Sequence, residues 1–501
     1  MGKKINQDYD ERRLYRRKRR IRNQIIAYIT VVIFFAAIIA GTVFGVRALT
    51  KLLSEKRQAE ELAKQLEEME NEEETVIEPP VSVEPPEEEV DWLEEMVASS
   101  IENMPLEDKV AGLFIVAPEA VTGVSQVIQA GEATQEALNK YPVGGFVYFE
   151  QNIVDKEQFV QMLSNTMGMR PEYPLFLAVD EEGGSVRRVG KSSIEVTEVG
   201  DMADIGAGGD TMKAYDAGTT IGFYLYELGL NVDFAPVADI VADPSNSAIG
   251  KRSFGSDPVL AGDMAAAMVT GIQERGVSSC LKHFPGIGSV AGDTHDGMAV
   301  LEKNLDELRA AEFQAFRAGI EAGAHFIMVS HVSVPNVVGD NTPCSLSEEM
   351  ITNLLRGELG YNGIVITDAM NMTAITEYYT ADDAAVRALK AGADMILMPE
   401  NFETAYQGVL NAVKEGVIAE ERINESLKRI YRVKLRDRID AEGNVVDSVA
   451  GESPEAADGQ GAESNDGTVP EGETGAEGSE GTVPEGEAGA EGGEGTVPEG
   501  A

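Results

Sequence analysis

The chain has 501 residues and a formal net charge of −45 at pH 7, from 86 acidic and 41 basic side chains. Its length exceeds that of one ordinary domain but allows one large α/β domain with appended segments. The two cysteines, Cys280 and Cys344, exclude a disulfide framework and most cysteine-based metal sites. We expect a buried free thiol at Cys280, with a single disulfide as the alternative.

Residues 1–46 have the pattern of a membrane anchor. Residues 1–24 contain ten lysines and arginines, and residues 25–46 form an uncharged apolar run of 22 residues. About 20 such residues are enough for a helix to cross a bilayer. The positive-inside rule predicts a single-pass protein of the cell membrane, with residues 1–24 in the cytoplasm and the rest outside the cell. A cleaved signal peptide is the alternative, although its apolar core normally has roughly 7–15 residues. The basic cluster therefore indicates topology and not binding to nucleic acid.

Charged and low-complexity segments follow the anchor and close the chain. Residues 47–90 combine a charged, helix-forming stretch with a Pro/Glu-rich stretch, which predicts a stalk helix and an extended linker. Residues 440–501 contain seventeen carboxylates, no lysine or arginine, and a Gly/Glu/Pro repeat with a period of 14 residues. Because this tail has almost no apolar side chains to bury, it is predicted to be disordered.

Residues 91–439 alternate apolar runs with helical stretches. Continuous apolar runs between helices are typical of parallel strands that are buried on both faces. Eight such runs predict an α/β fold, a (β/α)8 TIM-type barrel that forms the catalytic domain, and a doubly wound open sheet is the alternative. The runs are AGLFIVA from 111, VGGFVYF from 143, PLFLAVD from 174, LNVDFAP from 230, VSSCLKHF from 277, AHFIMVSH from 324, NGIVITD from 362 and ADMILMP from 393.

Polar side chains stand at the ends of these runs. A Gly-rich stretch, CLKHFPGIGSVAGDTHDG at 280–297, also holds two of the four histidines of the chain. In a barrel, the carboxyl ends of all strands lie on one face, which is where barrel enzymes place their active sites. The clustering predicts an active site on that face and favours it over solvated surface histidines. The strand-end residues are Asp180, Asp239, Lys282, His283, His331 and Asp368.

Ordered motifs between residues 104 and 399 resemble the family 3 glycoside hydrolases, in the single-barrel β-N-acetylglucosaminidase (β-N-acetylhexosaminidase) branch. The motifs are MPLEDKVAGLF, GGFVYFEQNI, VDEEGGSVRR, LNVDFAPVADI, IGKRSFGSDP, LKHFPGIG with DTH, IMVSH, PCSLS and GIVITDAMNM. The resemblance implies a retaining exo-β-N-acetylglucosaminidase that removes terminal N-acetylglucosamine from cell-wall glycans or muropeptides, without a cofactor or metal. Family members that act as β-glucosidases usually add a second α/β domain with an acid/base glutamate, and residues 440–501 offer none.

Retaining glycosidases need a carboxylate nucleophile and a proton donor on opposite sides of the glycosidic bond. The resemblance implies that Asp368 is the nucleophile and that His295, oriented by Asp293, is the acid/base, since an imidazole exchanges protons near neutral pH. The substrate-binding residues that it implies are Asp180, Arg188, Arg252, Lys282 and His283. For both arginines, a salt bridge at the rim is the alternative. We expect His331 to be structural and His325 to lie at the opposite end of the barrel.

Three positions depart from the family pattern. PGHG is here PGIG, with Ile287 in place of a histidine; GGRV is GGSV, with Ser185; and DSH is DTH. The last change is conservative. Ile287 removes a polar group from the loop that carries Asp293 and His295, which bears on the hinge geometry of that loop and on the level of activity.

Three other functions stay open on the sequence alone. They are a β-glucosidase-like enzyme, a phosphorolytic family 3 enzyme that transfers the sugar to phosphate, and an inactive, membrane-tethered barrel that binds the cell wall. A neutral imidazole repels phosphate less than a carboxylate would, but phosphorolysis is useful mainly where the sugar phosphate is retained, so an extracellular location favours hydrolysis. The expected partners are the carbohydrate substrate and the membrane, and the sequence identifies no protein partner.

The apolar run at 25–46 and the basic residues before it predict the orientation of the chain in the membrane. Protease added to intact protoplasts should remove the barrel domain, whereas the N-terminal segment should stay protected. Immunoblots against tags at each end measure both outcomes. Full protection of the barrel domain would contradict the predicted topology.

Overall fold

The computed structural model describes residues 91–241, 246, 248–290 and 299–438. The predicted anchor at 25–46, the stalk and linker at 47–90 and the acidic tail at 440–501 lie outside this range, as do Asp293 and His295. Within the described residues, none of the helices has the length and apolar character needed to span a bilayer. The described residues belong to one compact unit that begins at Val90.

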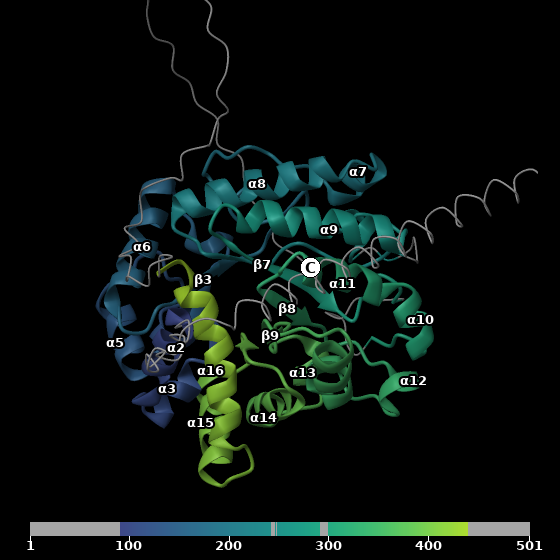
Figure 1. The fold of residues 1–501 in the computed structure, drawn as a ribbon. Helices are drawn as coiled ribbons and strands as arrows, with labels where there is room; N and C mark the ends of the chain where they lie inside the picture. Colours follow the sequence, from purple (N-terminus) through teal and green to yellow (C-terminus); the bar gives the residue numbers. More distant parts are fainter. Residues whose placement is uncertain (1–90, 242–245, 247, 291–298, 439–501) are drawn as a thin grey trace, which may run out of the picture. The chain divides into compact units, whose positions relative to one another are not determined.

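Eight parallel strands form a single sheet in the order β10-β1-β2-β3-β6-β7-β8-β9 (Figure 1). The strands are β1 (Phe114–Val116), β2 (Gly145–Val147), β3 (Phe176–Val179), β6 (Val232–Asp233), β7 (Ser278–Phe284), β8 (Phe326–Val329), β9 (Ile364–Thr367) and β10 (Ile396–Leu397). The two edges of the sheet meet, because Ile366 of β9 forms a bridge with Met395, next to β10, and the Thr367 amide donates to the Met395 carbonyl at 3.1 Å. The result is a nearly closed barrel of the TIM type. Each of the eight apolar runs contains one of these strands, which confirms that prediction.

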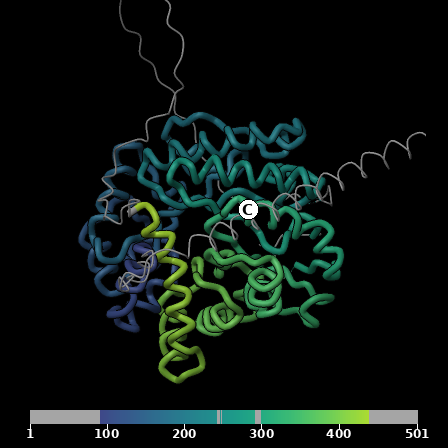
Figure 2. The backbone as a smooth tube through the Cα atoms, in the orientation of Figure 1, coloured from purple at the N-terminus to yellow at the C-terminus, as the bar shows by residue number. Residues whose placement is uncertain are grey.

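Helices separate the strands along the chain and surround the barrel (Figures 1 and 2). The longest described helices are α8 (Thr211–Leu228), α9 (Pro258–Gln273) and α16 (Glu420–Leu435). The others are α2 (Trp92–Glu102), α3 (Leu106–Ala111), α4 (Glu119–Thr122), α5 (Glu132–Lys140), α6 (Lys156–Met169), α7 (Met202–Ala207), α10 (Leu305–Ala310), α11 (Glu312–Glu321), α12 (Pro335–Val338), α13 (Thr373–Thr376), α14 (Ala381–Ala391) and α15 (Phe402–Lys414). Short 3-10 turns are η1 (Glu150–Asn152), η2 (Gly250–Arg252), η3 (Cys344–Leu346) and η5 (Arg436–Arg438), and η4 (Glu349–Glu358) is a π-helix.

Helices α8 and α9 lie side by side on the outside of the barrel (Figure 1). The side chain of Asp257 caps the first turn of α9 by accepting from backbone amides. A Cβ atom at Gly218 of α8 would lie 2.4 Å from the Met268 carbonyl, and one at Gly271 of α9 would lie 2.4 Å from the Tyr215 carbonyl. Glycines at these positions therefore allow the two backbones to approach this closely.

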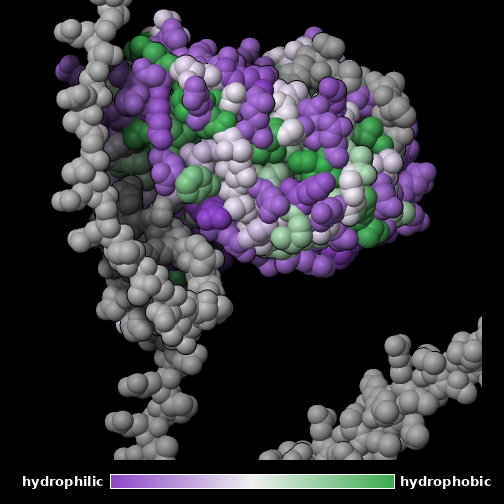
Figure 3. All heavy atoms as spheres, turned by 90° about the horizontal axis from the view of Figure 1, so that it is seen from above, coloured by the Kyte–Doolittle hydropathy of each residue, from purple (hydrophilic) through white to green (hydrophobic). Residues whose placement is uncertain are grey.

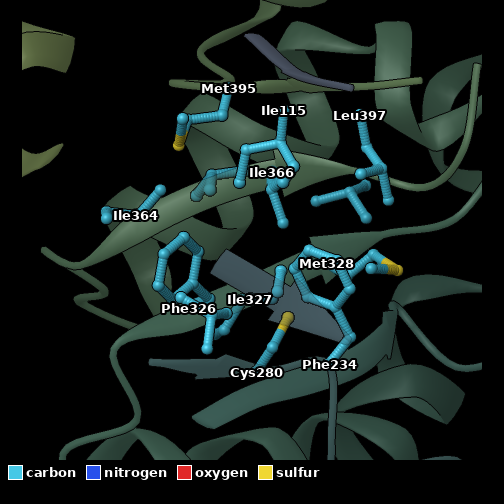
Figure 4. Packing of buried hydrophobic residues seen from close by; sticks show 14 of the residues in the cluster. Ile115, Phe234, Cys280, Phe326, Ile327, Met328, Ile364, Ile366, Met395 and Leu397 are labelled. Carbon is cyan, nitrogen blue, oxygen red and sulfur yellow. The ribbon is translucent and has the colours of Figure 1, made fainter. Parts of the chain in front are cut away.

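Apolar side chains from strands that are distant in the sequence pack together in the core. Figure 4 shows Ile115 of β1, Cys280 of β7, Phe326 of β8 and Ile366 of β9 in one cluster. Burial of an aliphatic or aromatic side chain of this size contributes about 1.5–3 kcal/mol. Cys280 and Cys344 are both buried and unpaired, so the expected free thiol is confirmed and the disulfide alternative is wrong.

The outer surface has the opposite character. Seen from the side on which α8 and α9 lie uppermost in Figure 1, hydrophilic residues predominate, with smaller hydrophobic areas between them (Figure 3). Met212, Phe223 and Val259 are exposed hydrophobic residues of these two helices. Such a mixture is ordinary for a surface in contact with water.

Asp394, which precedes β10, fastens α16 to the barrel. Its side chain is fully buried and accepts from Arg356 Nη2 at 2.5 Å, from Arg429 Nη1 at 3.1 Å and from Ser426 Oγ at 2.8 Å. The amide of Val365 in β9 donates to the same carboxylate at 3.0 Å. A buried carboxylate needs such partners, because water no longer solvates its charge. The contacts join α16, η4 and β9 at one point.

Substitution Asp394→Asn should destabilise the fold strongly, because it leaves buried guanidinium groups without their counter-charge. We expect a loss of about 3–5 kcal/mol in the free energy of unfolding, measured with urea. Asp383→Asn is the matched control, since Asp383 forms an exposed pair with Arg387 one helical turn away, and it should change the free energy of unfolding by no more than about 0.5 kcal/mol. Equal effects of the two substitutions would contradict the assigned role of Asp394.

Candidate active site

The carboxyl ends of three strands carry the central site residues. Asp180 follows β3, and Asp368 follows β9. Lys282 and His283 are the two residues before the last residue of β7. Because the strands are parallel, these ends share one face of the barrel.

A short hairpin brings Arg188 back beside Asp180. Strands β4 (Glu181–Gly183) and β5 (Val186–Arg187) pair antiparallel directly after Asp180. The turn between them contains Gly183 at φ +85° and Gly184 at φ +51°, a backbone region that glycine adopts without strain. The amide of Arg188 donates to the Asp180 carbonyl at 3.3 Å, and Arg188 Nη2 lies 3.7 Å from Asp180 Oδ2.

Four charged side chains form a continuous network, which we call the ion cluster: Asp180, Glu182, Arg252 and Lys282. Lys282 Nζ lies 2.8 Å from Asp180 Oδ1 and 2.6 Å from Glu182 Oε1. Arg252, the last residue of η2, donates to Glu182 through Nε and Nη2, each at 2.7 Å. Glu182 therefore accepts from both cations.

Electrostatics keep three members of the ion cluster, Glu182, Lys282 and Arg252, charged. Burial raises the pKa of Glu182, but the charges and hydrogen bonds of Lys282 and Arg252 outweigh burial and lower it to about 2. Burial lowers the pKa of Lys282, but Asp180 and Glu182 outweigh it, so the net shift is upward. The pKa of Arg252 also rises, because Glu182 offsets the effect of burial. Glu182 is thus an anion between two cations at neutral pH.

An irregularity in β7 allows two successive residues to reach this face. In a regular strand, neighbouring side chains point to opposite faces. The pairing of β7 with β8 shifts register between Leu281 and Phe284, and a local shift of this kind re-aims side chains at a strand end. Lys282 consequently contacts the ion cluster, while His283 contacts Asp239 and the edge of the same cluster.

Asp239 fixes the orientation and the tautomer of His283. His283 Nδ1 lies 2.7 Å from Asp239 Oδ2, and Asp239 Oδ1 accepts from the amides of His283 at 3.3 Å and Ile287 at 2.8 Å. His283 Nε2 lies 3.4 Å from Arg252 Nη2. Because a guanidinium can only donate, the network assigns the proton to Nδ1 and leaves Nε2 as an acceptor.

Asp368 is held as an ionised carboxylate. Its amide donates to the Val329 carbonyl at 2.9 Å, and its Oδ1 accepts from the Ala369 amide at 2.8 Å. Burial raises the pKa of Asp368, but the nearby imidazoles of His283 and His331, the hydrogen bond from the Ala369 amide and the charge of Lys282 together outweigh burial. The pKa of Asp368 consequently lies below its ordinary value. An ionised carboxylate at neutral pH is what a glycosidase nucleophile requires.

The two remaining described histidines lie at opposite ends of the barrel. His331 is buried after β8, with Nε2 3.0 Å from the Ala369 carbonyl and Nδ1 2.8 Å from Ser345 Oγ. A carbonyl only accepts, so Nε2 carries a proton and helps to hold the backbone next to Asp368. His325 precedes β8 and lies 3.0 Å from Arg436. Burial and this arginine lower the pKa of His325 to about 3.

Arg188 and Asp180 form the more accessible part of the site. Their side chains are 32% and 20% exposed, compared with 2% for Lys282. The guanidinium of Arg188 lies over the ring of Phe149 at 5.5 Å, and its buried Nε has no hydrogen-bond partner among the described residues. Both arginines make ion pairs, Arg188 with Asp180 and Arg252 with Glu182, and their role in binding substrate stays a prediction.

The start of the loop that carries Asp293 and His295 is anchored through its backbone. The Ile287 amide donates to Asp239, and the carbonyls of Ile287 and Val290 accept from Asn246 Nδ2 at 2.8 and 3.2 Å. Asp293 and His295 themselves lie outside the described residues. The predicted acid/base pair therefore stays a prediction.

Sequence analysis assigned no role to Glu182 or Asp239. Glu182 stands in the quoted motif VDEEGGSVRR, and Asp239 was noted only as a residue near the end of a run. In the structure, Glu182 accepts from Lys282 and Arg252, and Asp239 orients His283. The sequence offers only a weak signal for these roles, namely acidic residues that are predicted to be buried beside candidate cations.

Among the described residues, no group of three or more histidine, cysteine and acidic side chains is placed to hold a metal ion.

Comparison with known proteins identifies the family. The sequence profile described as "Glycosyl hydrolase family 3 N terminal domain" matches residues 105–433. The chain belongs to glycosyl hydrolase family 3. Family membership agrees with the barrel and with the position of the site at the carboxyl ends of its strands.

Similar proteins include named hexosaminidases. Beta-hexosaminidase A of Pseudoalteromonas piscicida is 30% identical over 329 residues, which are 60% of this chain and 54% of that protein. The chain therefore spans only about half the length of that relative. Beta-hexosaminidase LpqI of Mycobacterium tuberculosis is 31% identical over 339 residues, 65% of this chain and 82% of that protein. A solved glycoside hydrolase family 3 β-N-acetylglucosaminidase from Paenibacillus sp. is 34% identical with a TM-score of 0.64, covering 71% of this chain and 65% of that one.

The lowered pKa of Glu182 predicts how the ion cluster contributes to stability as a function of pH. Because the folded pKa of about 2 lies below the ordinary value of 4.5, the contribution is complete above pH 4.5 and disappears as the pH falls toward 2. The difference in free energy of unfolding between the wild type and Glu182→Gln should therefore be constant from pH 7 to 5 and shrink by on the order of 3 kcal/mol by pH 2. Urea unfolding at each pH measures it. A difference that stays constant down to pH 2 would contradict the assigned ionisation.

Proposed function

We propose that this chain is a retaining exo-β-N-acetylglucosaminidase. The observation that carries the proposal is an ionised carboxylate, Asp368, on the same face of the barrel as the ion cluster, where the charge of Lys282 acts on it. The names of the relatives, β-hexosaminidases and a β-N-acetylglucosaminidase, support this substrate class.

In the proposed reaction, Asp368 attacks the anomeric carbon and forms a covalent glycosyl-enzyme, and water then releases the sugar. The amide of Ala369 holds one carboxylate oxygen, which fixes the direction of the attacking group. Asp180, Arg188, Arg252, Lys282 and His283 bind the hydroxyl and carbonyl oxygens of the sugar. His295, oriented by Asp293, protonates the leaving oxygen and afterwards takes a proton from water.

The proposed substrate is terminal β-linked N-acetylglucosamine on glycans or muropeptides derived from peptidoglycan. The support is the location predicted from residues 1–46, namely a catalytic domain held outside the cell by a membrane anchor. A wall-derived substrate would be available there, whereas a sugar phosphate would be lost from the cell.

A chromogenic assay on the purified protein tests the reaction class. The 4-nitrophenyl β-N-acetylglucosaminide should be hydrolysed faster than the β-glucoside, and phosphate should not change the product. Formation of a sugar 1-phosphate would favour the phosphorolytic alternative, and preference for the glucoside would favour the β-glucosidase-like one. Absence of turnover would favour an inactive wall-binding barrel.

The proposed roles predict different losses of activity. Asp368→Asn should abolish turnover of every substrate, because formation and breakdown of the glycosyl-enzyme both need the carboxylate. His295→Ala should slow natural glycosides by up to about 10²–10⁴-fold, and aryl glycosides much less, because a phenolate leaves without a proton. Asp293→Asn should fall between these limits. Values of kcat and kcat/KM for a chitobiose-type and an aryl substrate measure the contrast.

His325→Gln is the control for removal of a histidine, since His325 lies at the opposite end of β8, and it should leave kcat/KM within about twofold for correctly folded protein. Equal losses on natural and aryl substrates in His295→Ala would show that His295 binds sugar and that the proton comes from another group.

A further inference from the structure

We propose that Glu182 is a positioning residue that sets the orientation of Lys282 and Arg252 toward the sugar, an inference that rests on the function proposed above. Glu182 is not itself a ligand of the substrate, because its side chain is only 2% exposed and both carboxylate oxygens are occupied. Oε1 accepts from Lys282 at 2.6 Å and from Arg252 Nη2 at 2.7 Å, and Oε2 accepts from Arg252 Nε at 2.7 Å.

These contacts determine which donors remain for a ligand. An ammonium group has three N–H donors, and Lys282 uses one on Asp180 and one on Glu182. Among the contacts of the described residues, a single donor of Lys282 is left, and its direction follows from the other two. Sugar recognition depends on such fixed donor directions, because hydroxyl groups are distinguished by position and not by charge.

Arg252 is constrained in the same manner. A guanidinium has five N–H donors in a rigid plane. Nε and one Nη2 hydrogen point at Glu182, the second Nη2 hydrogen faces His283 Nε2 at 3.4 Å, and Nη1 donates to the Ala248 carbonyl at 3.1 Å. One Nη1 donor is left without a partner within the part of the chain that the structure describes. The bidentate contact with Glu182 fixes the plane in which that donor lies.

Charge gives Glu182 a second effect on the same two residues. Lys282 and Arg252 are like charges that both contact one carboxylate. Without the negative charge of Glu182 between them, they repel each other, and only Asp180 still balances Lys282. Arg252 is then free to turn away from His283, and the remaining donors lose their common orientation.

The test compares Glu182→Gln with wild type in the full-length protein, using 4-nitrophenyl β-N-acetylglucosaminide for turnover and N-acetylglucosamine as the inhibitor. We expect KM and the inhibition constant to rise about 10- to 100-fold, by analogy with the loss at metal sites when partners that orient the ligands are removed, with a smaller change in kcat. Unchanged KM and inhibition constants would overturn the inference.

Glu358→Gln is the matched control, because Glu358 accepts from Arg309 in the same bidentate geometry, at 2.8 and 2.7 Å, on the outside of the domain. It should leave KM unchanged.

A double-substitution cycle distinguishes a positioning role of Glu182 from a purely structural one, because the two roles predict different KM values for the double variant. In an Arg252→Met background, Glu182→Gln should raise KM by less than about threefold, because one of its two partners is already absent. Fully multiplicative effects would overturn the inference.

Glu182→Asp is the second variant, for the case that Glu182→Gln does not fold. Aspartate retains the charge, but its side chain is too short to contact both Lys282 and Arg252. It should also raise KM, and a wild-type KM would overturn the inference. A wild-type protein that binds N-acetylglucosamine without turning over the glycoside would overturn the proposed activity alone, provided that Glu182→Gln still weakens binding. A wild type that neither binds nor reacts would overturn both.

Discussion

A buried carboxylate between two cations, Glu182 with Lys282 and Arg252, is the interaction on which the site depends. Removing these charges from water is costly, and the cost is offset only when each charge has close partners. Glu182 supplies contacts of 2.6–2.7 Å to both cations, and Asp180 supplies a second contact to Lys282. Glu182 and Lys282 can therefore be buried together, whereas an isolated charge could not.

The barrel makes this cluster possible because it brings distant segments to one face. Glu182 and Arg252 are 70 positions apart, and Asp180 and Lys282 are 102 positions apart. Only the carboxyl ends of parallel strands and the loops after them place such residues together. Stability at the opposite end depends on a different network, around Asp394, whose partners come from η4, β9 and α16. The site can therefore carry accessible polar groups such as Arg188, because the network around Asp394 stabilises the barrel at its other end.

The sequence was sufficient to predict the barrel, since strands buried on both faces appear as continuous apolar runs, and each of the eight runs contains a strand. It also predicted the strand-end residues, because their position follows from topology alone. It could not assign Glu182 or Asp239, whose roles come from contacts over 70 and 44 positions. The register shift that turns both Lys282 and His283 to one face has no signature in the sequence. Such features depend on tertiary pairing and not on local pattern.

Ile287, which replaces the histidine of the family's PGHG motif, illustrates why backbone contacts matter more at this point than side-chain identity. Its amide is held by Asp239 and its carbonyl by Asn246. Gly288 must be a glycine, because a Cβ atom there would lie 2.2 Å from the Ile240 carbonyl. The side chain of Ile287 is buried, where an apolar group needs no hydrogen-bond partner but an imidazole would. The backbone at the start of the loop is thus held by groups that isoleucine and histidine share, and the same carboxylate of Asp239 that orients His283 also binds the amide of Ile287.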